Sequence, residues 1–383
     1  MYRLKDDQQR IVEDAAVLAD ASIAPHAARV DRDAAFPQES IAALGGAGFM
    51  GLTVPHGAGG LGQGLRTAAA VLDEIARRCS STAMVYLMHL CGTACYAAAP
   101  DKTERYLKAA ARGAHLSTLA FSERGSRSHF WAPVSRATAT SGTTRLNARK
   151  SFVTSAGYAD GYVVSTLAAD AKSGVESSIF VVLSDDEGLR VSGTWQGLGM
   201  RGNASAPMDL ENVAVDADRA LTEPGRGLDL MLGVVLPLFQ VGAAAVSLGI
   251  AEAAVQATAR HLTSSRLEHM NSSLADLLTL RARLAQMRIE TDRARAHLVS
   301  VLDSLEAPGP ATELLVLEAK AAATEAALNV TDLAMRTCGG AAFGGAHGLE
   351  RLFRDARAPV VMAPTSDQAY DFIGRALCGM EVF

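Results

Sequence analysis

The chain has 383 residues, of which 49% are hydrophobic and 20% charged, and its formal net charge is −5. A single core stops growing at roughly 250 to 300 residues, so this length predicts two or three parts that share a large buried interior. The negative charge and the lack of a basic run argue against nucleic acid as a partner. The five cysteines have no metal-ligand spacing. We therefore expect no metal site, and reduced thiols in a cytoplasmic protein are the simplest interpretation.

The amino-terminal part of the chain has a helical pattern. Residues 1–7 are charged and lack the apolar stretch of a signal peptide, so the sequence does not indicate export. From there to residue 113, apolar side chains recur at three- and four-residue spacing, as in Ile11, Ala15 and Leu18. We place an N-terminal helical domain at residues 1–115.

Between residues 116 and 222 the pattern changes to that of strands. Runs rich in β-branched residues occupy 162–166 and 179–183, and segments 137–140 and 143–146 flank a Ser-Gly turn. A compact β domain of this length is within the normal size range of domains. We therefore expect a middle β domain at residues 116–222.

From residue 223 to 383 helical periodicity returns in long, alanine-rich segments, which is typical of a four-helix bundle. Residues 230–251 carry no charged side chain over about the length that crosses a bilayer. Pro237, Gln240 and Ser247 dilute the hydrophobicity of this stretch, so we expect a helix buried on all sides and no membrane contact. The sequence therefore predicts an α+β protein in the order helical, β, helical.

Five segments resemble, in the right order, motifs of the acyl-CoA dehydrogenase family. One of them is similar to the family pattern Val-Thr-Glu-Pro-x-Ala-Gly-Ser-Asp, and the last combines a glycine pair, a Leu-Glu-Arg…Arg-Asp-Ala-Arg helix and a short turn. The segments are 51–62, 121–129, 146–160, 197–202 and 338–366. The resemblance covers essentially the whole chain. It implies an N-terminal helical domain, a middle β-barrel-like domain and a C-terminal four-helix bundle.

The resemblance also implies an activity and a cofactor. Members of the family use FAD to desaturate an acyl thioester between its α and β carbons, with hydride transfer to flavin N5. By resemblance, Ser122 and the neighbouring backbone at Phe121 would meet the pyrimidine edge of the flavin, and Thr154 would hydrogen-bond near N5. Phe152 stands where the family's tryptophan stacks. Taken alone, residues 152–154 are an ordinary strand with alternating faces, and the motif around them favours the flavin interpretation.

The pyrophosphate and adenine end of FAD is bound, in the family, across a subunit contact. By resemblance Arg266, Arg336 and the pair Gly339 and Gly340 would bind it, since the glycines let backbone approach a phosphate closely. Thr365, in the carboxy-terminal turn, would also contact the cofactor. This arrangement implies a homodimer or homotetramer.

The catalytic base is where the sequence departs from the family. Ala363 stands in the turn where the family usually carries its glutamate, followed by Pro364 in place of glycine. Some members carry the glutamate on the long helix after the β domain, and that position is Leu238 here. Proton abstraction next to the thioester needs a base held close to the α-carbon, and neither side chain is one.

Three residues are candidates for a substitute base: Glu123, Asp367 and His129. Simpler interpretations exist for two of them, a charge at the start of a helix for Asp367 and a solvated basic loop for His129. The resemblance also implies substrate contacts at Ser128 and at Gln240, which stands where an arginine is common in the family.

Of three functions, the sequence favours the first, because the β-domain motifs follow the dehydrogenase pattern closely. The first is oxidation of an acyl thioester, carried by CoA or by a carrier protein, with an electron-acceptor flavoprotein or oxygen taking the electrons. The second is a flavin-dependent monooxygenase of the same fold, because such relatives need no base for an α-proton. The third is a non-catalytic partner subunit of a heteromeric dehydrogenase.

Overall fold

A computed structural model of the chain describes residues 2–127, 129–140, 142–345 and 347–382. Its amino-terminal part is a group of helices with short connections. Pro100 opens the last of these helices at a position where its missing N–H removes no hydrogen bond. The helices are α1 (Asp6–Ser22), α2 (Ala27–Arg32), α3 (Gln38–Gly46), α4 (Leu65–Arg78), α5 (Ser80–Ala97) and α6 (Pro100–Ala111).

The middle part holds two sheets. One has the order β1 (Ser117–Ala120), β4 (Gly161–Leu167), β5 (Ser177–Leu183), and the other β2 (Thr138–Thr140), β3 (Thr143–Val153), β7 (Ala206–Asp216), β6 (Leu189–Val191). Strands β1 and β4 pair in parallel, and the other pairs in these two sheets are antiparallel. Just after β1 the chain bonds to β3, where the Ser151 amide donates to the Ser122 carbonyl over 3.0 Å. The two sheets are therefore joined by backbone hydrogen bonds.

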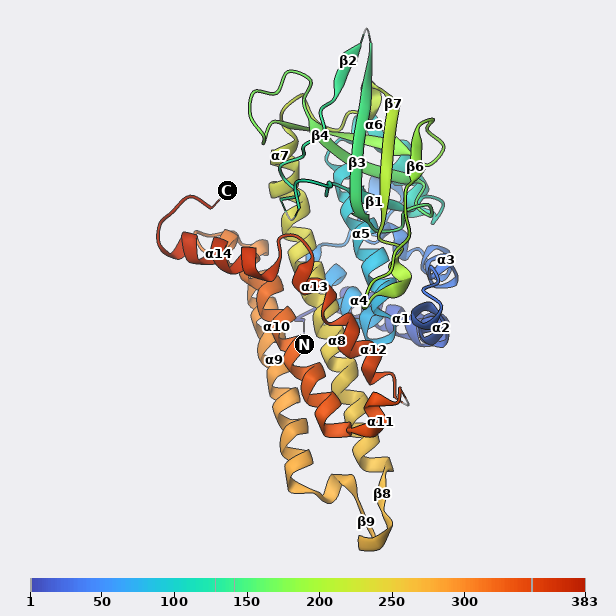
Figure 1. The fold of residues 1–383 in the computed structure, drawn as a ribbon, viewed down its shortest axis with the longest axis vertical. Helices are drawn as coiled ribbons and strands as arrows, with labels where there is room; N and C mark the ends of the chain where they lie inside the picture. The colour runs from blue at the N-terminus through green and yellow to red at the C-terminus, as the bar shows by residue number, and fades with distance from the viewer. Residues whose placement is uncertain (1, 128, 141, 346, 383) are drawn as a thin grey trace.

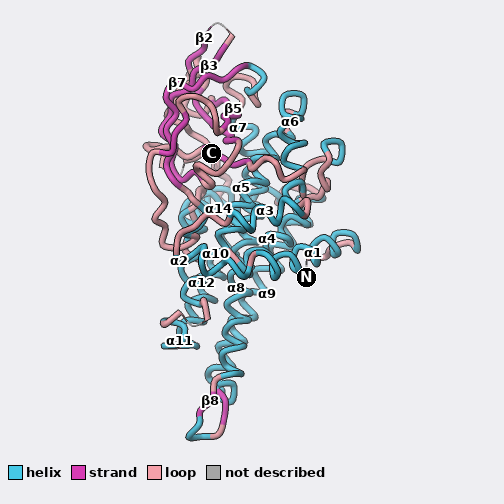
Figure 2. Tube along the Cα trace, turned by 90° about the vertical axis from the view of Figure 1, so that its right-hand side faces the viewer, coloured by secondary structure: helices cyan, strands magenta, loops and turns pink. Residues whose placement is uncertain are grey.

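The carboxy-terminal part is helical again. It contains α7 (Gly227–Leu230), a π-helical turn at Met231–Val235, α8 (Leu236–Ser264), the strand pair β8 (Arg266–Leu267) and β9 (Ser272–Ser273), α9 (Leu278–Glu306), α10 (Thr312–Cys338), α11 (Gly340–Phe343), α12 (Leu349–Asp355), α13 (Ala358–Val361) and α14 (Ser366–Leu377). Figure 1 shows α8, α9 and α10 side by side, with the two large sheets at one end of the molecule and β8–β9 at the other. The side view in Figure 2 places the β8 hairpin at the same far end. The predicted order of helical, β and helical parts is confirmed.

A buried charge network ties the amino-terminal helices to the bundle. Asp73 of α4 accepts hydrogen bonds from Tyr2 (2.8 Å), Arg77 (2.9 Å) and Arg295 of α9 (3.1 Å). Burial alone would raise the pKa of Asp73, but Arg295 and Arg77 hold that pKa below its usual value. The carboxylate therefore stays charged and holds the two helical parts together.

The long apolar helix expected from the sequence is part of the core. Residues 227–264 are long and apolar enough to cross a bilayer, but 83% of their most apolar window is buried inside the fold. A Cβ at Gly242 would lie 2.2 Å from Leu87 of α5, and one at Gly249 would lie 2.5 Å from the Asp73 carbonyl. This close packing on α4 and α5 fits a core helix, as the sequence predicted.

Candidate functional site

A cavity of about 490 Å³ opens where the β sheets meet the bundle. Its walls come from α5, the segment after β1, the end of β3, residues 195–205, the start of α8 and the turn after α13. Five positions singled out from the sequence line it together: Phe121, Ser122, Phe152, Thr154 and Ala363. This volume lies within the range of small-molecule sites.

Phe152 supplies an aromatic face to the cavity. The β3–β7 register shifts between Lys150 and Val153, and Phe152 within this bulge has a φ of 55°. The bulge turns the ring out of the sheet, so that it is 69% exposed and meets the ring of Trp195 edge-on at 6.5 Å. A large apolar ring left this open in a cavity offers a surface for a flat partner.

Thr154 supplies a hydroxyl that its neighbours hold in place. Its Oγ1 lies 2.9 Å from Ser205 Oγ, and its carbonyl accepts a hydrogen bond from Thr118 over 2.9 Å. Thr154 and Ser205 are both buried and both line the cavity. A hydroxyl can donate once and accept twice, so Thr154 keeps capacity for a bound molecule.

Residues 195–205 are fixed against the bundle. Trp195 Nε1 donates to the Met200 carbonyl (3.1 Å), and the Met200 amide donates to Asp355 of α12 (2.6 Å). Burial raises the pKa of Asp355 to about 6. A Cβ at Gly199 would lie 2.4 Å from the Arg354 carbonyl, so only glycine allows this approach. These contacts set where Trp195 stands in the cavity wall.

Glu123 lies in an ion pair and does not line the cavity. It is buried, and it accepts hydrogen bonds from Lys150 Nζ (2.6 Å), the Val134 amide (2.9 Å) and both donors of Ser135. Burial alone would raise its pKa, but Lys150 and Ser135 hold that pKa below its usual value. This geometry does not support Glu123 as the base, because its carboxylate is taken up by Lys150 of β3 and by the segment at Val134 and Ser135.

The other two candidate bases also lie outside the cavity wall. His129 is exposed, packs edge-on against Trp131 at 5.1 Å and contacts the Ser126 carbonyl. Asp367 is exposed in the first turn of α14. Thr365 caps that helix by accepting the Gln368 amide (3.2 Å), so its hydroxyl serves the helix end and does not line the cavity. These positions match the simpler interpretations.

Lys320 of α10 was not singled out from the sequence. Its side chain is fully buried, and Nζ donates to the carbonyls of Met362 (2.9 Å) and Pro364 (2.8 Å), on either side of Ala363. Burial lowers the pKa of Lys320 to about 7. The one signal in the sequence is a lysine between Ala319 and Ala321 on an otherwise apolar helix face. Lys320 therefore holds the turn that forms the helical wall of the cavity.

The predicted substrate contacts are less well placed. Gln240 is completely buried in α8, and neither polar atom of its amide has a partner among the residues that the structure describes. Leu236 and Phe239 of the same helix line the cavity, whereas Leu238 and Gln240 do not. Ser128 lies outside the described residues.

The second group of predicted cofactor residues lies at the far end of the bundle. Arg266 is on β8 and donates to Asn271 (3.3 Å), and Arg336, near the end of α10, is 3.6 Å from Asp332. Gly339 has a φ of 55°, and among the described residues no atom beyond the local backbone lies within 4 Å of a Cβ built on it or on Gly340. Helix α8 begins at the cavity and ends beside Arg266, and its 29 residues rise roughly 40 Å. A single chain therefore does not bring the two groups together.

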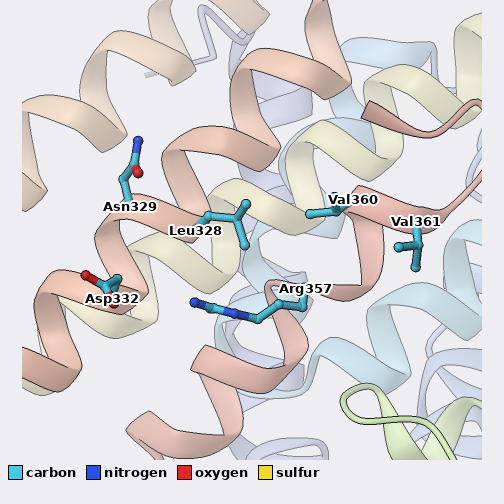
Figure 3. Close-up of a pocket in the computed structure, with 6 residues that line it drawn as sticks. All are labelled: Leu328, Asn329, Asp332, Arg357, Val360 and Val361. Carbon is cyan, nitrogen blue, oxygen red and sulfur yellow. The ribbon is translucent and has the colours of Figure 1, made fainter. Parts of the chain in front are cut away.

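A second, open hollow lies between α10 and the segment that includes α13. It is lined by Leu328, Asn329, Asp332, Arg357, Val360 and Val361. Figure 3 shows the Arg357 side chain extending toward the α10 residues. That guanidinium lies 3.3 Å above the Phe353 ring and donates to Thr331 (3.0 Å), so it is already engaged. Val361 lines both this hollow and the cavity.

Comparison with known proteins gives one consistent family. Models of the acyl-CoA dehydrogenase N-terminal, middle and C-terminal domains match residues 5–114, 118–213 and 225–378. The chain is 28% identical over 382 residues to the probable acyl-CoA dehydrogenase FadE25 of Mycobacterium tuberculosis, covering 98% of this chain and 97% of that protein. It is 28% identical to cyclohex-1-ene-1-carbonyl-CoA dehydrogenase of Syntrophus aciditrophicus, covering 98% and 91%.

Solved structures share the fold at lower identity. Butyryl-CoA dehydrogenase from Megasphaera elsdenii superimposes with a TM-score of 0.92 at 22% identity, covering 98% of this chain and 99% of that one. The FAD complex of PigA gives a TM-score of 0.90 at 18% identity, covering 98% of each chain. Both likenesses concern the fold.

Proposed function

This chain belongs to the acyl-CoA dehydrogenase family and is a flavin oxidoreductase, and from that premise we propose that it desaturates an acyl thioester without a carboxylate base in its cavity. The observation that carries the proposal is the cavity that unites Phe121, Ser122, Phe152 and Thr154 with Ala363. The first four supply an aromatic face and hydroxyl groups. The fifth is, by the family resemblance, at the position where the family usually carries its base.

The residues of the cavity fit an isoalloxazine ring. Such a ring has apolar faces and a polar edge, and the cavity offers the exposed ring of Phe152 together with the hydroxyls of Ser122, Thr154 and Ser205. Phe152 would lie against a ring face, and Thr154, held by Ser205, would hydrogen-bond to the polar edge. When bound, FAD supplies the hydride acceptor.

The cavity binds and shields the substrate but has no evident base. Among its described lining residues there is no aspartate, glutamate, histidine or lysine. General-base participation is typically worth ~10² to 10⁴ in rate. The chain therefore favours thioesters whose α-proton is unusually acidic and oxidises plain saturated ones slowly.

A second copy of the chain completes the cofactor site in this proposal. Arg266, Arg336 and the Gly339–Gly340 pair lie too far from the cavity to reach one FAD with it. In a homodimer or homotetramer, the partner subunit's bundle would bring these groups to the cavity. Electrons would leave to an electron-acceptor flavoprotein or to oxygen.

Anaerobic mixing of the FAD-loaded protein with butyryl-CoA and a panel of acyl-CoAs tests the proposal. We expect slow bleaching of the flavin absorbance and a product lighter by two hydrogen atoms. If none of the thioesters in the panel reduces the flavin, but the protein consumes oxygen when a flavin reductase is added, the protein would instead be a monooxygenase. Constant co-purification with a glutamate-bearing homologue, without turnover by either chain alone, would make it a partner subunit.

A further inference from the structure

We propose that Arg127 is the anion-binding residue of the cavity, and that the thioester substrate carries an anionic oxygen group, a phosphate or a carboxylate, on the part that lies at the cavity mouth. This assignment rests on the proposed function, because it concerns the substrate of the same cavity. The residues proposed to bind the flavin ring do not depend on Arg127.

Arg127 is the single formally charged side chain among the described residues that line the cavity. It is exposed to solvent as well as lining the cavity, which places it at the opening. Its neighbours in the wall include Phe130, Phe239 and Leu236, which are apolar. A charge beside such surfaces acts through a lower effective dielectric than in water, so it attracts an anion more strongly.

Within the described part of the chain, the Arg127 guanidinium makes no hydrogen bond or ion pair. The nearest acid in sequence, Glu123, is already bound by Lys150 and Ser135. Arg136, by contrast, donates to three backbone carbonyls. An uncommitted planar guanidinium is suited to bind a phosphate or a carboxylate through two parallel hydrogen bonds.

The backbone at this position favours glycine. Arg127 has a φ of 51°, in the left-handed region that costs least for a residue without a Cβ. The family pattern that residues 121–129 resemble has glycine at this place. The chain therefore carries a long cationic side chain where its own backbone conformation disfavours one, which indicates a use for the side chain.

The anionic group has two possible sources. One is a phosphate of the arm that carries the acyl group, and the other is a carboxylate on the acyl group itself. Three thioesters separate them: butyryl-CoA has the phosphates only, S-butyryl-N-acetylcysteamine has neither, and S-glutaryl-N-acetylcysteamine has the carboxylate only.

The test is titration calorimetry of the FAD-loaded protein with these three thioesters, for wild type, Arg127→Gly and Arg127→Lys. Glycine suits the left-handed backbone, so folding is preserved. We expect Arg127→Gly to weaken binding of the anionic thioester roughly tenfold, to leave S-butyryl-N-acetylcysteamine unaffected, and to flatten the dependence of affinity on salt. Lysine keeps the positive charge but lacks the two parallel N–H donors of the guanidinium, so Arg127→Lys should recover part of the loss.

Arg124→Ala is the matched control, since Arg124 is an exposed cation of the same loop that does not line the cavity. A loss for butyryl-CoA alone assigns the phosphate, and a loss for the glutaryl thioester alone assigns the carboxylate. Equal losses in Arg124→Ala and Arg127→Gly, or none in Arg127→Gly, would overturn the assignment. A wild type that holds FAD but binds no thioester would overturn the proposed function itself.

Discussion

The two walls of the cavity differ in chemistry. The β wall carries hydroxyls and an aromatic ring at Ser122, Thr154, Ser205 and Phe152, whereas the helical wall, from the start of α8 and the turn around Ala363, is apolar throughout its described lining. The β wall has what a flavin ring needs, and the helical wall lacks what proton abstraction needs. In the proposed function, cofactor binding and acid–base chemistry would therefore depend on separate segments of the chain, so that one could be lost without the other.

The largest effect should come from giving the helical wall a carboxylate. In Ala363→Glu we expect flavin reduction by butyryl-CoA to accelerate by ~10² to 10⁴, measured by anaerobic stopped-flow absorbance. Lys320 holds both flanking carbonyls, so the turn should keep its position. Ala363→Gln is the control with equal bulk and no base. Equal rates in both variants would show that position 363 does not reach the α-carbon.

The next largest effect concerns the support of the β wall. Lys150→Met would leave the Glu123 carboxylate buried without its counter-ion, and breaking such a pair costs about 3–5 kcal/mol. Denaturant unfolding should show this loss, together with reduced FAD content. The double variant Glu123→Gln, Lys150→Met should recover much of the stability, because no unpaired charge remains. A single variant as stable as wild type would mean that the pair does not fasten the loop.

A smaller effect should appear as a pH dependence of the free energy of unfolding, caused by Lys320 behind the helical wall. Lys320 has a pKa of about 7 in the folded chain, against ~10.4 for an unfolded lysine. Between these two pKa values the unfolded state binds more protons than the folded state. The free energy of unfolding therefore increases as the pH rises from 7 toward the unfolded pKa. Between pH 7 and 9 the gain should be about 2 kcal/mol.

The measurement is the difference in unfolding free energy between wild type and Lys320→Met across this pH range. The difference should change with pH, because methionine cannot titrate. Lys108→Met, at an exposed lysine on α6, should track wild type. A constant difference between wild type and Lys320→Met would mean that Lys320 keeps an ordinary pKa.

The smallest effect should come from the β wall itself. Thr154→Val removes one hydroxyl, for which about 1 kcal/mol is typical, so FAD affinity should fall about fivefold and the flavin spectrum should shift. Thr118→Val is the matched control, since Thr118 bonds to the Thr154 carbonyl but does not line the cavity. Unchanged affinity and spectrum in Thr154→Val would remove that hydroxyl from the cofactor site.

The sequence alone predicted the order of helical and β parts, because local periodicity carries that information. It also singled out Phe121, Ser122, Phe152 and Thr154, since these lie in short contiguous motifs. It did not reveal Lys320, whose partners are 42 and 44 residues away. Such contacts depend on how helices pack, and no local pattern encodes them.

The candidate bases show the same limit. Glu123 and Lys150 are 27 residues apart, and nothing in either segment indicates that they pair. Once paired, the carboxylate that looked available in the sequence is fully committed. Acidic residues near a motif therefore cannot be identified as a base until it is known which of them form ion pairs with lysine or arginine.

The length of α8 makes cofactor uptake a concentration-dependent equilibrium in the proposed assembly. Because one chain holds the two predicted groups of cofactor residues roughly 40 Å apart, self-association and FAD binding would be thermodynamically linked in that assembly. Dilution should release flavin from protein that retains it at high concentration. Added FAD should in turn promote association of dilute subunits. The flavin absorbance per subunit would therefore increase with protein concentration.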